Sequence, residues 1–94
     1  MDSETISKIK HDLKEGGYNI YVYSYPCGMY FPEHKHNYPK VHIVLSGTLK
    51  VNMPDEEIIL QEGDRLEVPA NVPHTAEVLG DGPMVCIDAT KPVE

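Results

Sequence analysis

The chain has 94 residues, a length that suits one domain built around one core. Fifteen acidic residues against eight basic ones give a formal charge of −7, and a surface of that sign repels nucleic acid and anionic lipid, so neither is an expected partner. No apolar run approaches the roughly 18 residues of a membrane-spanning helix, and the opening residues are too polar for a signal peptide, so we expect a cytoplasmic protein.

Apolar side chains recur at helical spacing near the start of the chain, at Ile6, Ile9 and Leu13. They predict a short amphipathic helix over residues 4–14, with Ser3 as its N-cap and Gly16-Gly17 as its stop. His11 on this helix is interpreted as a surface residue.

From residue 18 onward, short runs of β-branched and aromatic residues alternate with Gly, Pro, Asn and Asp, a pattern typical of strands. The predicted strands are residues 19–25, 29–33, 40–45, 48–53, 57–61, 65–68, 74–79 and 84–89. Eight short strands suit a barrel. Turn residues at 46–47, 53–55 and 80–83 predict that neighbouring strands form antiparallel hairpins.

The chain has two cysteines, Cys27 and Cys86, and no CxxC pair, so neither a disulfide framework nor a thiolate zinc site is expected. We interpret both as reduced residues packed as small apolar side chains.

Three histidines have a spacing that could hold a metal ion. His34 and His36 are two residues apart where the chain should be extended, which puts both imidazoles on one face. His74 is a candidate third ligand because Pro73 precedes it and a strand-like run follows. Three neutral imidazoles with an open coordination position form a known catalytic metal arrangement, although an HxH pair alone also occurs by chance on exposed strands.

Around these histidines the sequence resembles the cupin superfamily, whose motifs read G-x5-H-x-H-x3,4-E-x6-G and G-x5-P-x-G-x2-H-x3-N. The matching residues are Gly28, His34, His36 and Gly47 in the first motif and Gly63, Pro69 and His74 in the second. The resemblance implies an all-β fold, a double-stranded β-helix or jelly-roll-type barrel, here with a short N-terminal helix. It also implies one cupin domain over residues 1–94, with a helical segment at 1–17, the barrel at 18–90, and His34, His36 and His74 as metal ligands.

The sequence departs from the second motif at Asn71, where the family prefers Gly, and at Val78, where it has Asn. Asn tolerates a left-handed backbone better than most residues, so the turn at Asn71 can survive.

The departure in the first motif changes the metal site, because Lys40 occupies the position of the acidic ligand. A protonated ammonium cannot coordinate an ion, so Lys40 turns aside, its pKa falls, or the metal is weakly held. His42, on the same strand face, could supply a fourth nitrogen instead. Lys40 is also the candidate catalytic residue, because it could pair with a negative charge on the substrate or exchange a proton with it.

The run at 40–45 alternates an apolar face of Val41, Ile43 and Leu45 with a face that carries Lys40 and His42. Periodicity alone would leave Lys40 and His42 exposed on the surface. We prefer burial of both faces, in which the apolar stripe belongs to a dimer interface, and so expect a homodimer.

The tyrosines divide into two groups. Packing is expected for Tyr18, Tyr21, Tyr23 and Tyr25, whereas Tyr30 and Tyr38 flank the histidines and are expected to line the pocket. Glu33 should face away from His34 into solvent, since adjacent strand residues point in opposite directions.

Two functions follow from these features. The first is a metal-binding cupin, an oxygenase or isomerase that uses a divalent ion (Fe, Mn, Ni or Zn) to act on a small anionic molecule. The alternative is a small-ligand-binding or sensing module without catalysis and without metal, in which an anion lies beside Lys40. Retention of three histidines favours the first, and loss of the acidic ligand favours the second.

Overall fold

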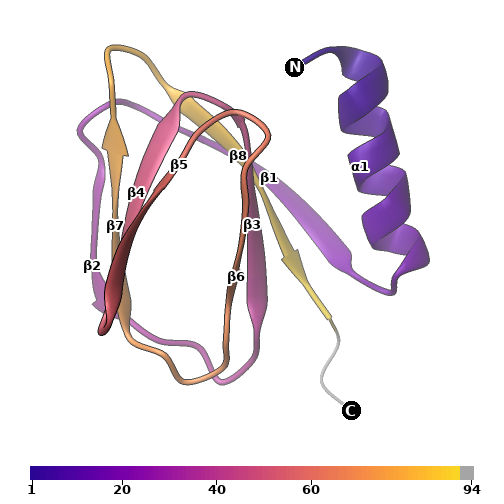
Figure 1. The fold of residues 1–94 in the computed structure, drawn as a ribbon. Helices are drawn as coiled ribbons and strands as arrows, with labels where there is room; N and C mark the ends of the chain where they lie inside the picture. Colours follow the sequence, from indigo (N-terminus) through magenta and orange to yellow (C-terminus); the bar gives the residue numbers. More distant parts are fainter. Residues whose placement is uncertain (92–94) are drawn as a thin grey trace.

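The computed structural model describes residues 1–91. It contains one helix followed by eight strands, which Figure 1 shows in chain order. The elements are α1 (Ser3–Glu15), β1 (Asn19–Tyr25), β2 (Tyr30–His34), β3 (Lys40–Ser46), β4 (Thr48–Met53), β5 (Glu56–Leu60), β6 (Arg65–Val68), β7 (His74–Leu79) and β8 (Met84–Thr90). Each predicted element is present, and the strand ends differ from the prediction by a residue or so. Within residues 1–91 no helix is long and apolar enough to cross a membrane.

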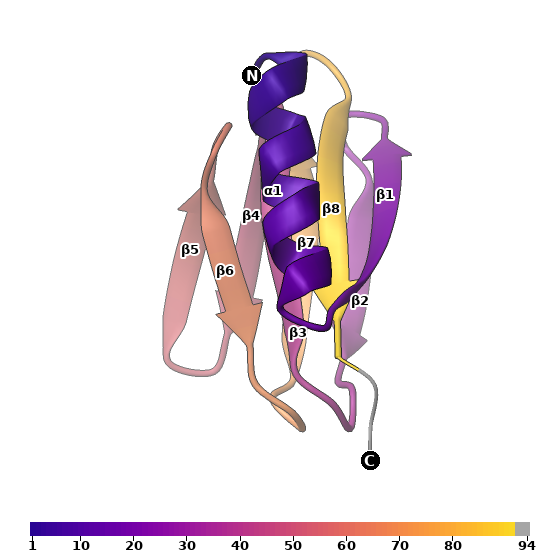
Figure 2. The same ribbon diagram turned by 90° about the vertical axis from the view of Figure 1, so that its right-hand side faces the viewer.

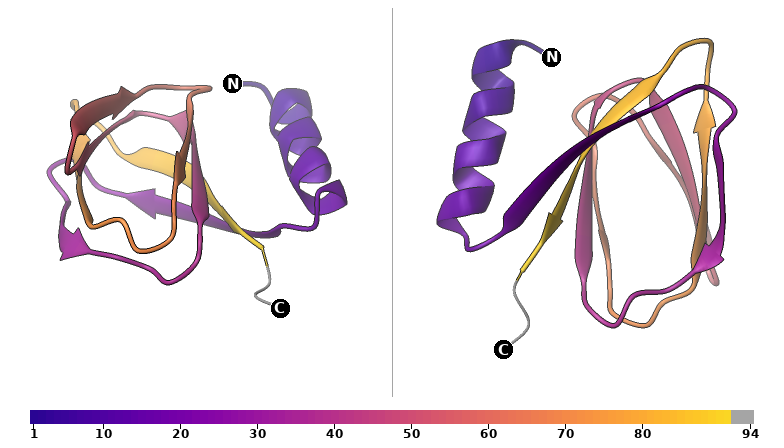
Figure 3. Two further views of the ribbon diagram at one scale, coloured as in Figure 1. Left: turned by 60° about the horizontal axis from the view of Figure 1, so that its bottom comes forward. Right: turned by 180° about the vertical axis from the view of Figure 1, so that it is seen from behind.

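The strands form two four-stranded antiparallel sheets that face each other. One has the order β1-β8-β3-β6 and the other β2-β7-β4-β5. Figure 3 shows how the two sheets curve around a common interior. This architecture is a jelly-roll-type barrel, so the predicted all-β fold class is confirmed.

The prediction that all three turns close hairpins was wrong for two of them. Only the turn between β4 and β5 joins strands that pair with each other. The turns at 46–47 and 80–83 carry the chain from one sheet to the other. These two corners touch: a Cβ built on Gly47 would lie 2.7 Å from the carbonyl oxygen of Pro83. Turn residues signal a reversal of the chain but not whether the next strand pairs or crosses.

The prediction of a dimer interface on the stripe of Val41, Ile43 and Leu45 was also wrong. Helix α1 of the same chain covers this face, as Figure 2 shows, and Leu13 packs among the stripe residues. Periodicity identifies a face that must be buried, but not the element that buries it. The homodimer stays a prediction that this face does not support.

Helix α1 also begins differently from the prediction. Asp2, rather than Ser3, is the N-cap, and its side chain accepts a 2.8 Å hydrogen bond from the backbone N–H of Thr5. Both residue types cap helices well, so composition could not choose between neighbours.

The stripe residues and Leu13 form one apolar core, between helix α1 and its sheet. A second apolar core lies between the two sheets and includes Val44, Leu49, Val51 and Val78. Lys40 and His42 face this interior from β3 and are mostly buried, so the surface interpretation of these two residues does not hold. The interior is therefore lined by apolar side chains together with polar groups from β3, and the candidate site lies there.

Candidate metal centre

His34, His36 and His74, the three-histidine group, meet at one end of the barrel interior. His34 is the last residue of β2 and lies directly opposite His74, the first residue of β7. His36 follows two residues after the end of β2. One ligand nitrogen from each ring lies within 4.8 Å of the other two, a spacing at which one ion can contact all three.

The backbone sets the orientation of two of these rings. Nδ1 of His34 donates to the carbonyl of Pro32 at 2.8 Å, and Nδ1 of His74 donates to the carbonyl of Val72 at 2.9 Å. A carbonyl can only accept, so Nδ1 carries a hydrogen in both rings, and in the neutral ring the lone pair is on Nε2. A hydrogen bond of this kind, from the nitrogen that does not bind metal, is typical of metal-ligating histidines.

His36 supplies the observation that tests whether a metal fits. Its Nε2 is buried and has no hydrogen-bond partner within residues 1–91. The imidazole ring of His36 stacks on the ring of Tyr38, with centroids 5.3 Å apart. The backbone carbonyl of His36 accepts a hydrogen bond from the backbone N–H of Asn71 at 2.6 Å. Asn71 has a φ of 65°, so it adopts the left-handed turn expected of it. A buried nitrogen without a partner is costly, and a bound ion would satisfy it.

Burial favours the neutral form of two of these rings, His36 and His74. Burial, followed by the positive charge of Lys40, lowers the pKa of His36. Burial also lowers the pKa of His74, against the opposing effect of its hydrogen bond to Val72. A neutral imidazole is the form that binds a metal ion.

The three-histidine group opens into a cavity of about 200 Å³ between the sheets. Its walls combine polar groups with apolar ones such as Phe31, Leu49 and Val51. The prediction that Tyr30 and Tyr38 line this pocket was wrong. Tyr30 is 57% exposed, whereas Tyr25 and Phe31 reach the cavity.

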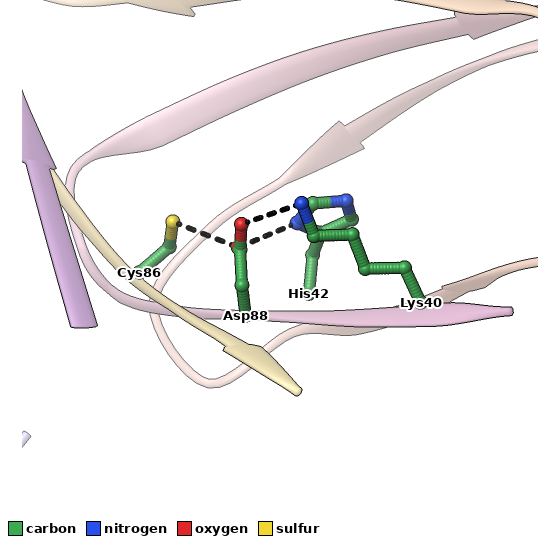
Figure 4. Close-up of polar contacts among 4 residues, drawn as sticks. All are labelled: Lys40, His42, Cys86 and Asp88. Atoms are coloured by element: carbon green, nitrogen blue, oxygen red, sulfur yellow. Dashed lines mark hydrogen bonds and ion pairs between the residues drawn. The ribbon is translucent and has the colours of Figure 1, made fainter. Parts of the chain in front are cut away.

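On the other sheet, across the interior from the three-histidine group, Asp88 contacts Lys40 and His42. We call these three residues the Asp88 network, which Figure 4 shows. One carboxylate oxygen is 3.0 Å from Nζ of Lys40, and the other accepts from Nδ1 of His42 at 2.8 Å. His42 and Asp88 are directly opposite each other on β3 and β8. Burial alone would raise the pKa of Asp88, but the hydrogen bond from His42 and the positive charge of Lys40 lower it.

The Asp88 network answers the question raised by Lys40. The ammonium turns toward a carboxylate inside the cavity, so its charge is partly neutralised. His42 is not part of the three-histidine group, and its Nδ1 is taken by Asp88.

Sequence reasoning missed Asp88, although a signal was present. It is the acidic residue in the otherwise apolar run of β8, where a buried carboxylate needs partners. Its partners lie on β3, far away in the sequence.

The two cysteines differ. Cys86 is buried, and its Sγ donates to Asp88 at 3.6 Å. Burial, reinforced by the Asp88 charge, raises the pKa of Cys86 to about 12, so this thiol stays protonated. Cys27 is exposed, so its predicted packing was wrong. It lies in the loop between β1 and β2, where apolar character alone does not ensure cover.

The chain matches the family model of the cupin domain over residues 21–90, and so it belongs to the cupin superfamily. A search of curated proteins finds no match.

Solved structures agree with this assignment. A cupin-2 domain containing protein from Shewanella frigidimarina is 26% identical with a TM-score of 0.62, and the match covers 76% of this chain and 69% of that one. A cupin-like protein from Thermotoga maritima is 26% identical with a TM-score of 0.72, covering 82% and 59%. The DMSP lyase DddQ from Ruegeria pomeroyi is 25% identical with a TM-score of 0.72, covering 81% of this chain but only 39% of the lyase. The chain thus spans well under half of that enzyme.

Proposed function

We propose that this cupin holds a divalent metal ion (Fe, Mn, Ni or Zn) on its three-histidine group and binds a small anionic molecule in the adjoining cavity. The observation that carries the proposal is the buried, unpartnered Nε2 of His36 beside two rings whose Nδ1–H groups are fixed by the backbone. We assign the metal to these three residues alone, because His42 is already bonded to Asp88.

Neutral imidazole ligands would leave the full positive charge of the ion available, and the chemistry supplied would be that of a Lewis acid. Lys40 adds a second positive group. An ammonium has three N–H donors, so the contact with Asp88 leaves two for a ligand carboxylate. A small carboxylate that contacts both Lys40 and the three-histidine group would use two positively charged features of one cavity, whose lining includes all four residues.

We further propose that the chain is an enzyme, an oxygenase or an isomerase. The likeness to the DMSP lyase, of which the match covers 39%, supports an enzyme over a binding module. A metal-free ligand-binding module is the alternative, and it is favoured by Lys40 standing where the family motif has an acidic ligand.

Calorimetric titration with pyruvate, a small carboxylate, tests the proposal. We expect binding to the Zn(II)-loaded protein that disappears after the zinc is removed by a chelator. Lys40→Met should weaken binding about tenfold, the equivalent of one charge-assisted hydrogen bond of about 1.5 kcal/mol. Lys35→Met is the matched control, because Lys35 is exposed and does not line the cavity.

Binding that survives metal removal would favour the metal-free module, and no binding to the loaded protein would contradict the proposal.

A further inference from the structure

His42 is a buried polar group that the three-histidine group does not use. It projects from β3 into the cavity, and its side chain is only 15% exposed. Nδ1 is anchored by Asp88 on the neighbouring strand β8, directly opposite in the register. The ring is attached to one strand and hydrogen-bonded to the next, so it has little freedom to turn.

This anchoring decides which nitrogen faces the ligand. An ionised carboxylate can only accept, so Nδ1 of His42 carries a hydrogen, and in the neutral ring the lone pair is then on Nε2. Within residues 1–91, the hydrogen bond of the His42 ring is the one at Nδ1. Figure 4 shows the second ring nitrogen, Nε2, on the side of the imidazole away from Asp88. A carboxylate that orients an imidazole in this way is the arrangement of a proton acceptor.

The surroundings of His42 restrict the ligand. Lys40 lies two residues earlier on the same strand face, so an ammonium and a basic nitrogen are adjacent. The cavity of about 200 Å³ has room for roughly six water-sized groups at about 30 Å³ each. Lys40 and His42 contact the two oxygens of one carboxylate, that of Asp88, so they lie close together. A ligand carboxylate beside Lys40 would place the next one or two carbon atoms of a small acid near His42.

We propose that His42 is the proton acceptor of this cavity, and that its substrate is a small 2-oxo acid with a hydrogen on the carbon next to its carbonyl group. This inference rests on the proposed function and names the substrate class of the same site.

In the step that follows, the C–H bond of that carbon breaks and its proton moves to Nε2 of His42. The electron pair forms a carbon–carbon double bond, and the electrons of the carbonyl group move to its oxygen, which becomes negative. The Nδ1–H group stays bonded to Asp88, whose charge balances the new imidazolium. Return of a proton from His42 to carbon completes an exchange or an isomerisation without any oxidant. Asp88 acts in this step as a positioning residue.

Deuterium uptake by the methyl group of pyruvate, followed by proton NMR in D₂O with the Zn(II)-loaded full chain, tests the step. We expect exchange that depends on the protein and that falls about 100-fold in His42→Gln, the lower end of what general base catalysis contributes. Zinc content and pyruvate affinity should be unchanged in this variant. His11→Gln is the matched control, since His11 is an exposed helix residue, and its exchange rate should equal that of the unmodified chain.

A second measurement does not depend on turnover or on the folding of His42→Gln. Nitrogen-15 NMR of the metal-free chain should show His42 protonated at Nδ1 and unprotonated at Nε2. Asp88→Asn keeps a hydrogen-bond acceptor but removes the balancing charge, so exchange should slow about tenfold with pyruvate affinity retained.

The outcomes separate the two proposals. Absence of pyruvate binding to the loaded chain overturns the proposed function and, with it, this step. Binding without exchange, an exchange rate in His42→Gln equal to that of the unmodified chain, or a hydrogen on Nε2 of His42 overturns the role of His42 alone.

Discussion

Asp88 is the residue that allows two other polar side chains to lie inside the barrel. It is buried, with 10% of its side chain exposed, and contacts Lys40 and His42 through different oxygens. Without it, an ammonium and an imidazole would face an apolar interior with no partner.

We therefore expect Asp88→Ala to lower the free energy of unfolding by about 3 kcal/mol, because it leaves the charge of Lys40 buried and unpaired. Urea unfolding of the chelator-treated protein measures this. Asp55→Ala, at an exposed turn, is the control and should change stability by less than about 0.5 kcal/mol. Equal effects of the two substitutions would show that the Asp88 network does not hold the fold.

The lowered pKa values of His36 and His74 predict a pH dependence of the metal-free protein. In the unfolded chain these imidazoles take up protons near their ordinary value of 6.5, whereas in the folded chain they stay neutral to lower pH. Between pH 6.5 and the lower pKa values of the folded state, the unfolded chain thus binds more protons than the folded one. The contribution of the two rings to the free energy of unfolding is fully present above pH 6.5 and is lost as the pH falls through that window.

Urea unfolding between pH 7 and pH 5, the range of about two units around the ordinary histidine value, checks this dependence. The variant His36→Gln/His74→Gln should show a shallower loss of stability. His11→Gln should keep the original slope, because His11 is exposed. An unchanged slope in the double variant would rule out burial of the two rings as the cause.

At the scale of elements, the corner after β3 constrains the fold more than its neighbours do. Gly47 has a φ of 84°, and an added Cβ would lie 2.7 Å and 2.8 Å from backbone atoms of Pro83 and Met84. Gly80 has nearly the same φ, 85°, but open space around it. Substitution at Gly80 thus measures backbone strain alone, whereas substitution at Gly47 measures the same strain together with a steric clash.

Gly47→Ala should therefore cost about 3 kcal/mol or more, since strain and a backbone clash add together. Gly80→Ala should cost only about 1 kcal/mol, the strain of a left-handed alanine. Thermal and urea unfolding of both variants give the comparison. Similar costs would mean that the two corners do not pack as the structure places them.

The elements also show what the sequence could predict. Turn residues and period-two alternation act locally, so the eight strands were predicted to within a residue or so. The contact between helix α1 and Ile43, and the crossing of the chain between sheets at Gly47, depend on tertiary packing. No local pattern contains that information.

The same distinction holds for the site. His34 and His36 could be paired from their spacing, and the family motif added His74. Asp88 could not be assigned in this way, because its contacts with Lys40 and His42 arise only when β3 pairs with β8. A charged residue within a motif thus had a partner that lay outside the motif.

At the scale of the whole molecule, the barrel separates two tasks. The outer face of one sheet packs against helix α1 and builds one core, while the space between the sheets holds the second core, the three-histidine group and the Asp88 network. A bound ion would join β2 and β7 through His34 and His74, so metal binding should also stabilise the folded chain.

Metal content tests the central claim most directly. Untagged protein purified without chelator, or loaded with Fe(II), Mn(II), Ni(II) or Zn(II), is analysed by inductively coupled plasma mass spectrometry beside His34→Ala/His74→Ala, with His11→Ala as control. The account predicts about one ion per chain in the unmodified protein and in the control, and almost none in the double variant. A chain that takes up none of the four metals, or a double variant that keeps its metal, would contradict it.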